Sequence, residues 1–152
     1  MADAHEYYME LAIKEAKSAG QIGEVPVGAI LVSENGEILS AAHNLTIKLV
    51  DPTAHAEILA LRKAALEINN YRLLNTTLYV TVEPCIMCMG AIVHARISRV
   101  VFGTTDPKWG AAGSLYNVAE DDRLNHHVEI ITGARAEDCR RLMQDFFRAK
   151  RD

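Results

Sequence analysis

The sequence predicts an α/β fold, in which a single mixed sheet of five strands is covered by helices on both faces. Segments with apolar residues at helical spacing alternate with short β-branched runs, which is typical of this class. Asn35-Gly36 is a hairpin signal between two such runs, whereas helical segments separate the later runs and favour parallel pairing. With 152 residues the chain has the size of about one domain, and we expect one domain over residues 1–152.

The first half of the chain predicts a helix, a hairpin and a second helix. Residues 4–19 have helical periodicity. The expected inward face of this helix is formed by Tyr8, Leu11, Ala12, Glu15 and Ala19. Apolar runs at 27–32 and 37–42 flank the hairpin turn. Asp51-Pro52-Thr53 is typical of a helix start, and residues 54–68 follow with their apolar positions on one face.

The second half predicts three more strands and two more helices. Strand-helix-strand units in this half are expected to cross over right-handed. The expected strands are 77–82, 99–103 and 128–131, and the expected helices are 86–95 and 136–150. An irregular segment of about twenty residues, 104–126, precedes the last strand. Long irregular segments in small domains are usually functional, so this one is a candidate binding loop.

The composition excludes several classes of protein. With 49% hydrophobic and 24% charged residues, the chain is neither disordered nor a repeat array. No apolar run approaches the roughly 18 residues of a membrane span, and no membrane partner is expected. The acidic N-terminus lacks the features of a signal peptide, so we expect a cytoplasmic protein. Its three cysteines are then reduced thiols, available for a metal or for catalysis.

The charge of the chain is unevenly distributed. Sixteen basic and 20 acidic residues give a net charge of −4, which disfavours a protein whose whole surface binds nucleic acid. Residues 135–152 nevertheless hold six basic residues against four acidic ones. Two interpretations stay open: a local basic patch, or a solvated helix end at which cations favour the negative end of the dipole.

Two short motifs at expected helix starts carry the chemistry. Cys85 and Cys88 lie three residues apart, so they share a helix face and present two sulfur atoms to one point. His55 adds an imidazole, and three such ligands suit a catalytic Zn²⁺ with a fourth position open for water. The metal lowers the pKa of that water towards neutrality and so generates hydroxide. Glu57, two residues after the histidine, is placed to shuttle a proton.

Each motif taken alone fits more than one kind of site. A Cys-x-x-Cys pair can be a redox pair or half of a structural metal site, and a His-x-Glu pair at a helix start can be a cap or plain surface. A structural zinc would need a fourth ligand, but Cys139 lies on an apolar helical stripe and is expected in the core. A redox pair would leave His55 and Glu57 without a role. The two motifs together therefore favour a catalytic zinc site.

The motifs resemble those of the cytidine deaminase superfamily. Residues 52–57, Pro-Thr-Ala-His-Ala-Glu, and residues 83–88, Glu-Pro-Cys-Ile-Met-Cys, carry this resemblance. More narrowly, the chain is similar to the bacterial tRNA-specific adenosine deaminases, from about residue 6 to residue 151. The segments that carry this closer resemblance are 24–29, 42–44, 106–114 and 124–129.

The resemblance implies a three-layer α/β/α fold and a homodimer with one zinc per subunit, which converts the wobble adenosine of a tRNA anticodon to inosine. His55, Cys85 and Cys88 would ligate the metal, and Glu57 would be the general acid and base. The backbone amides of Ala56 and Cys85 would hold the zinc-bound oxygen and the substrate. The implied substrate contacts are Asn44, Ala56, Pro84, Asp106, Lys108, Phe147 and Arg148.

Two other functions stay open. The first is a deaminase of free bases or nucleosides, such as guanine, cytosine or cytidine, because the zinc chemistry is common to all of them. The second is a non-catalytic RNA-binding module, against which Glu57 argues, because a zinc scaffold has no use for that carboxylate. The helix expected at 86–95 is apolar on all sides and fits either a dimer surface or plain core.

Overall fold

A five-stranded mixed sheet lies at the centre of the computed structural model, which describes residues 2–151. The strands are β1 (Gly28–Ser33), β2 (Ile38–His43), β3 (Thr76–Val82), β4 (Arg99–Thr104) and β5 (Glu129–Thr132). Their order across the sheet is β2-β1-β3-β4-β5. β1 pairs antiparallel with β2 and β3, and β4 pairs parallel with β3 and β5. Met1 and Asp152, the ends of the predicted single domain, lie outside the described residues.

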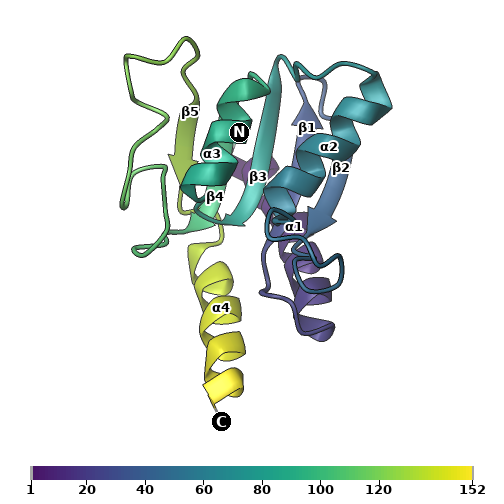
Figure 1. The fold of residues 1–152 in the computed structure, drawn as a ribbon, viewed down its shortest axis with the longest axis vertical. Coiled ribbons are helices and arrows are strands. Elements are labelled where there is room, and N and C mark those ends of the chain that lie inside the picture. The colour runs from purple at the N-terminus through teal and green to yellow at the C-terminus, as the bar shows by residue number, and fades with distance from the viewer. Residues whose placement is uncertain (1, 152) are drawn as a thin grey trace.

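Helices cover both faces of the sheet, which confirms the predicted three-layer fold (Figure 1). The helices are α1 (Ala2–Gln21), α2 (Ala56–Ile68), α3 (Ile86–His94) and α4 (Ala136–Arg151). One core lies under α1 and α4 and contains Val101, and the other lies under α2 and α3 and contains Val100. Successive strand residues point to opposite faces, so both cores form on one sheet. Each helix within residues 2–151 is either too short or too polar to cross a membrane.

The inward face of α1 differs from the predicted one by part of a turn. Its buried residues are Met9, Ala12, Ile13, Ala16 and Ala19. Tyr8 and Glu15, predicted on this face, are only half-buried. The reason is a close approach between backbones: a Cβ on Gly28 would lie 2.0 Å from the carbonyl oxygen of Ala12. At this crossing point Ala12 and Ala16 face Gly28, while the larger Met9 and Ile13 pack on the sheet to either side of it.

The start of α2 is also later than predicted. Asp51 caps a separate turn, in which its Oδ1 accepts hydrogen bonds from Thr53 N (2.8 Å) and Thr53 Oγ1 (2.7 Å). The helix itself begins at Ala56, with His55 as an N-cap residue in extended conformation. The capping signal in the sequence therefore belongs to the preceding turn, and His55 is left outside the helix.

The irregular segment predicted at 104–126 is confirmed between β4 and β5. Two isolated β-bridges order it: Cys85 pairs with Gly110, and Ala112 pairs with Asn117. The first of these bridges joins the segment to the start of α3. The segment is therefore fixed next to the predicted metal ligands.

Candidate active site

Three metal-binding side chains converge where α2 and α3 begin. His55 and Cys85 are the N-cap residues of these helices, both with extended backbone, and Cys88 lies in the first turn of α3. The Nδ1 atom of His55 lies 3.7 Å from the Sγ of Cys85 and 3.5 Å from the Sγ of Cys88. All three ligand atoms lie within 4.8 Å of one another. The structure therefore brings together the three residues that the sequence predicts as ligands.

The donor set fits Zn²⁺. Zinc bonds of about 2.1 Å to nitrogen and 2.3 Å to sulfur, at a tetrahedral angle, place the two donors about 3.6 Å apart. The observed separations of 3.5 and 3.7 Å agree with this value. Among residues 2–151 the group has three members. Three protein ligands are typical of catalytic zinc sites, in which water takes the fourth position.

The two thiols differ in how readily they ionise. A hydrogen bond with Cys88 lowers the pKa of Cys85 to about 4, and the contact with His55 adds to this effect. The pKa of Cys88 is raised, first by its interaction with Cys85 and then by burial. A second thiolate therefore needs a positive charge in the cluster. A divalent cation supplies that charge. The N-terminal end of α3, the positive end of its dipole, also stabilises the thiolates.

Glu57 lies in the first turn of α2, two residues after His55, and is 4% exposed. The pKa of its carboxyl is raised to about 7, chiefly by burial and also by the nearby Cys85, although a backbone hydrogen bond and His55 lower it in part. A buried carboxyl beside a metal cluster is typical of a functional group rather than of a structural one. Glu57 is therefore the candidate for proton transfer.

A cavity of about 1300 Å³ opens over the metal cluster. It is bounded by the starts of α2 and α3, by the segment after β4 and by α4 from Arg140 onward. Eight predicted site residues line it: Asn44, His55, Glu57, Cys85, Asp106, Lys108, Phe147 and Arg148. Cys88 is fully buried below the cavity. The side chains of Ala56 and Pro84 are not among the lining groups.

The cluster has counterparts in known proteins. Residues 2–104 match the family model for the cytidine and deoxycytidylate deaminase zinc-binding region. A tRNA-specific adenosine deaminase from Haemophilus influenzae is 50% identical over 147 residues, which cover 97% of this chain and 85% of the relative. The chain belongs to the tRNA-specific adenosine deaminase family. It is therefore a zinc-dependent hydrolytic deaminase.

Solved structures agree with this family. A structure from a study of tRNA:A34 deaminases superposes on the chain with a TM-score of 0.86 and 40% identity, covering 90% of this chain and 98% of that one. A guanine deaminase from Nitrosomonas europaea superposes with a TM-score of 0.80 at 21% identity, covering 93% of this chain and 83% of that one. At that identity the likeness shows the fold alone. The shared fold therefore does not say which purine is the substrate.

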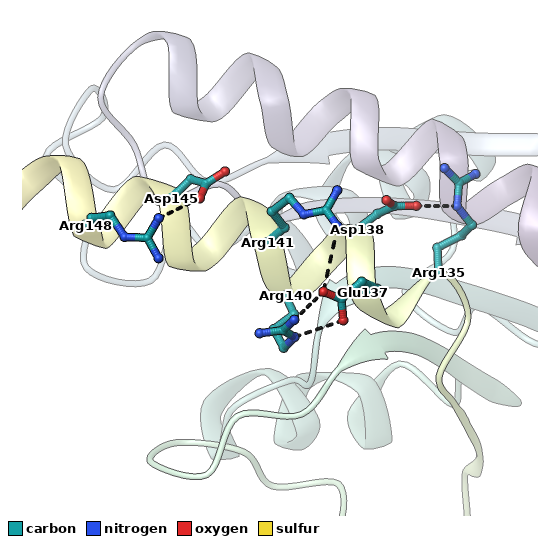
Figure 2. Close-up of polar contacts among 7 residues, drawn as sticks. All are labelled: Arg135, Glu137, Asp138, Arg140, Arg141, Asp145 and Arg148. Atoms are coloured by element: carbon teal, nitrogen blue, oxygen red, sulfur yellow. Dashed lines mark hydrogen bonds and ion pairs between the residues drawn. The ribbon is translucent and has the colours of Figure 1, made fainter.

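Three arginines of α4, Arg140, Arg141 and Arg148, pair with acidic residues of the same helix (Figure 2). Arg148 lies 3.7 Å from Asp145, and Arg135, the residue just before the helix, pairs with Asp138 at 2.7 Å. Glu137 contacts both Arg140 and Arg141. Pairs at this spacing stabilise a helix and orient its cations. Four cations of α4 line the deaminase cavity, namely Arg140, Arg148, Lys150 and Arg151, which supports the basic-patch interpretation of the C-terminal segment.

Two buried carboxylates of the deaminase were missed in the sequence. Glu83, 3% exposed, accepts hydrogen bonds from the backbone N–H groups of Asp106, Ala112 and Ser114, each at 3.0 Å. Burial opposes its ionisation, but these bonds and one from the Ser114 hydroxyl outweigh burial and lower its pKa. Glu83 therefore fixes the segment after β4 beside the metal ligands.

Glu24 fixes the facing loop in the same way. Its carboxylate, 1% exposed, accepts hydrogen bonds from Ile47 N at 3.1 Å and from Lys48 N at 2.8 Å. Burial raises its pKa, but these backbone bonds and the Thr46 hydroxyl outweigh burial, and the net shift is downward. Both residues begin segments that carry the resemblance to the family, 24–29 and 83–88, but the sequence gives no sign of the backbone groups that their carboxylates bind.

Predicted backbone contacts of the substrate are partly occupied within the chain. The N–H of Ala56 donates to Oδ1 of Asn44 at 2.7 Å. The carbonyl of Pro84 accepts from Ala111 N at 2.8 Å. The substrate contacts of Ala56 and Pro84 therefore stay predictions, while the amide nitrogen of Asn44 remains the group that can face a nucleoside.

Proposed function

We propose that this deaminase converts the wobble adenosine of a tRNA anticodon to inosine. The observation that carries the proposal is one cavity that is lined both by His55, Cys85 and Glu57 and by the cations of α4. Its volume of about 1300 Å³ exceeds the roughly 300–1,000 Å³ of small-ligand pockets. The names of the relatives, which specify tRNA and A34, support the same substrate.

The reaction needs a water, a proton carrier and a held base. Zinc held by His55, Cys85 and Cys88 would act as a Lewis acid that lowers the pKa of water. The Glu57 carboxylate accepts a proton from water as the water oxygen bonds to the amino-bearing carbon of adenine, and it delivers this proton to the amino nitrogen. The bond between that carbon and the amino nitrogen then breaks, ammonia leaves, and the hydroxyl proton left on the base moves to the ring nitrogen of inosine. We infer that Asn44, whose Oδ1 is held by Ala56, orients the nucleoside through its amide nitrogen.

An anticodon loop suits this cavity because its bases are already unstacked, so one of them can enter without melting a duplex. Asp106 and Lys108 lie on the fixed segment after β4, and Phe147 and Arg148 lie on α4; all four line the cavity. We infer that the cations contact phosphates. Replacing Arg148, Lys150 and Arg151 by glutamine is expected to reduce the slope of log Kd against log salt by about 2, at about 0.7 per phosphate.

The matched control replaces Lys14 and Lys17, exposed cations on α1 that do not line the cavity. This pair is expected to leave the salt slope as it is. An equal slope in the α4 variant and in the control would remove α4 from the RNA contact.

We further propose a cytoplasmic homodimer with one zinc in each subunit. The outer side of α3 supports self-association, because Ala91 and Val93 are only partly buried and do not line the cavity. The three free thiols support a reducing compartment. Sedimentation of the Val93→Glu variant is expected to show a shift towards monomer.

The proposed function is tested with the zinc-loaded enzyme and an anticodon stem-loop that carries adenosine at the wobble position. Free guanine, cytidine and adenosine are assayed in parallel for ammonia, and inosine is measured in the RNA. Glu57→Gln is expected to keep its zinc and to lose about 10²- to 10⁴-fold in kcat. Glu67→Gln, an exposed position on the same helix, is the control. Ammonia from guanine or cytidine without inosine in the RNA would instead establish a free-base deaminase.

A further inference from the structure

Trp109 is an exposed aromatic residue in the wall of the active-site cavity. It is the single tryptophan of the chain, and 67% of its surface is exposed. Tryptophan is highly buried on average in folded proteins. Trp109 lines the same cavity as His55 and Glu57. A large apolar side chain left exposed at this place indicates a contact made by the substrate.

The backbone on both sides of Trp109 is fixed. Oδ1 of Asp106 accepts hydrogen bonds from Lys108 N at 3.1 Å and from Trp109 N at 3.3 Å. Gly110 packs directly on the carboxyl of Glu83, since a Cβ there would lie 2.3 Å from its Cδ. A fixed backbone lowers the entropy that the indole loses when a ligand binds.

The charges around Trp109 fit a nucleic acid. Lys108 precedes it, and Arg148 and Lys150 of α4 line the same cavity. Proteins bind single-stranded nucleic acid through cations that contact phosphates and aromatic rings on which bases stack. The combination around Trp109 has both elements, whereas interfaces between protein subunits are depleted in lysine, and two of these three cations are lysines.

We propose that the Trp109 indole is a stacking site for an unpaired nucleobase beside the target adenosine in the same RNA loop. This site rests on the proposed function, because it needs an RNA in the cavity. Every base has a π-face, so the site accepts any neighbouring base. Loss of the indole is expected to weaken RNA binding about 5- to 150-fold, the equivalent of about 1–3 kcal/mol for one stacked base. The effect falls on Kd and KM more than on kcat.

The first test compares Trp109→Ala with Trp109→Phe in the zinc-loaded enzyme at one ionic strength. Binding of a labelled anticodon stem-loop is measured by anisotropy, and KM and kcat are measured by inosine formation. Trp109→Phe, which keeps an aromatic face, is expected to restore most of the affinity. Tyr71→Ala is the control, because Tyr71 is 72% exposed and does not line the cavity. Wild-type affinity in Trp109→Ala would overturn the proposal.

The second test uses the intrinsic fluorescence of the wild-type chain, which reports on Trp109 alone. Saturation with the stem-loop is expected to quench the emission. Two further stem-loops each lack the base on one side of the target. The one that lacks the stacked base is expected to bind more weakly and to leave the emission unquenched. Unchanged emission with every RNA would overturn the proposal. So would a change that follows protein concentration instead of RNA, because it would place Trp109 between subunits.

The two tests also separate this inference from the proposed function. Quenching and binding without inosine would leave the stacking site in place and would refute wobble deamination. Inosine formation with equal KM in Trp109→Ala and wild type would refute the stacking site alone.

Discussion

Replacement of Glu83 by glutamine is expected to loosen the segment from Asp106 to Ser114. One carboxylate oxygen accepts from Asp106 N and the Ser114 hydroxyl, and the other accepts from the backbone N–H groups of Ala112 and Ser114. The NH2 group of the glutamine costs least when it replaces the oxygen that faces Asp106 N, because the Ser114 hydroxyl at that oxygen can rotate and accept a hydrogen bond from it. One backbone N–H then loses its acceptor, at about 1–3 kcal/mol. Burying a neutral amide costs less free energy than burying a carboxylate, and this difference offsets part of the loss.

The assay is urea unfolding of the zinc-loaded protein, followed by two probes. Trp109 fluorescence reports on the segment after β4, and far-UV circular dichroism reports on the helices. In the wild type the two transitions are expected to coincide, as two-state unfolding requires. In Glu83→Gln the fluorescence transition is expected to have its midpoint at a lower urea concentration than the circular dichroism transition. The control is Glu34→Gln in the exposed hairpin turn. Coincident transitions at wild-type stability in Glu83→Gln would refute the argument.

Three further predictions concern the core, the metal and pH. Gly28→Ala is expected to lower the free energy of unfolding by about 3 kcal/mol or more, because its Cβ would lie 2.0 Å from the Ala12 carbonyl oxygen; calorimetry measures this, and a change below about 1 kcal/mol would contradict it. Removal of zinc by a chelator is expected to lower the Tm, because the thiols of Cys85 and Cys88 then lose their cation, and added zinc is expected to restore it; an unchanged Tm would argue against a folded-state zinc site. The lowered pKa of Glu24 stabilises the fold fully above the unfolded value of about 4.3, and this stabilisation is lost as pH falls through the folded pKa. Glu24→Gln is therefore expected to flatten the acid limb of stability against pH, and an acid limb like that of the wild type would exclude Glu24 as its source.

Local features of this fold could be predicted from the sequence. Asn35-Gly36 marks the hairpin in the sequence, but the turn is one residue longer than the two-residue turn that this pair predicts: Ser33 pairs with Glu37 across residues 34–36, and Gly36 alone in this loop has positive φ, at 86°. The metal ligands could be predicted for a related reason. Cys85 and Cys88 share the start of one helix, and the chemistry of the donors, rather than their separation along the chain, points to His55 as their partner.

Features set by distant contacts could not be predicted. The face of α1 depends on Gly28, which lies beyond the helix and fixes how closely the backbones approach. Glu24 and Glu83 act on backbone groups 23 to 31 residues further along the chain. A backbone N–H group can donate a hydrogen bond whatever the side chain of its residue, so the residue type of the donor does not reveal the bond. A single sequence therefore holds no pattern for these acceptors.

The outer half of α4 extends past the end of the sheet (Figure 1). Its inner end is anchored by Cys139, which packs directly on Gly103 of β4: a Cβ on that glycine would lie 2.3 Å from the Sγ of Cys139. Beyond Phe146 every described side chain is exposed. Substitutions there carry little folding cost, so the proposed RNA contact can be altered at this end of α4 without unfolding the metal site that shares the cavity.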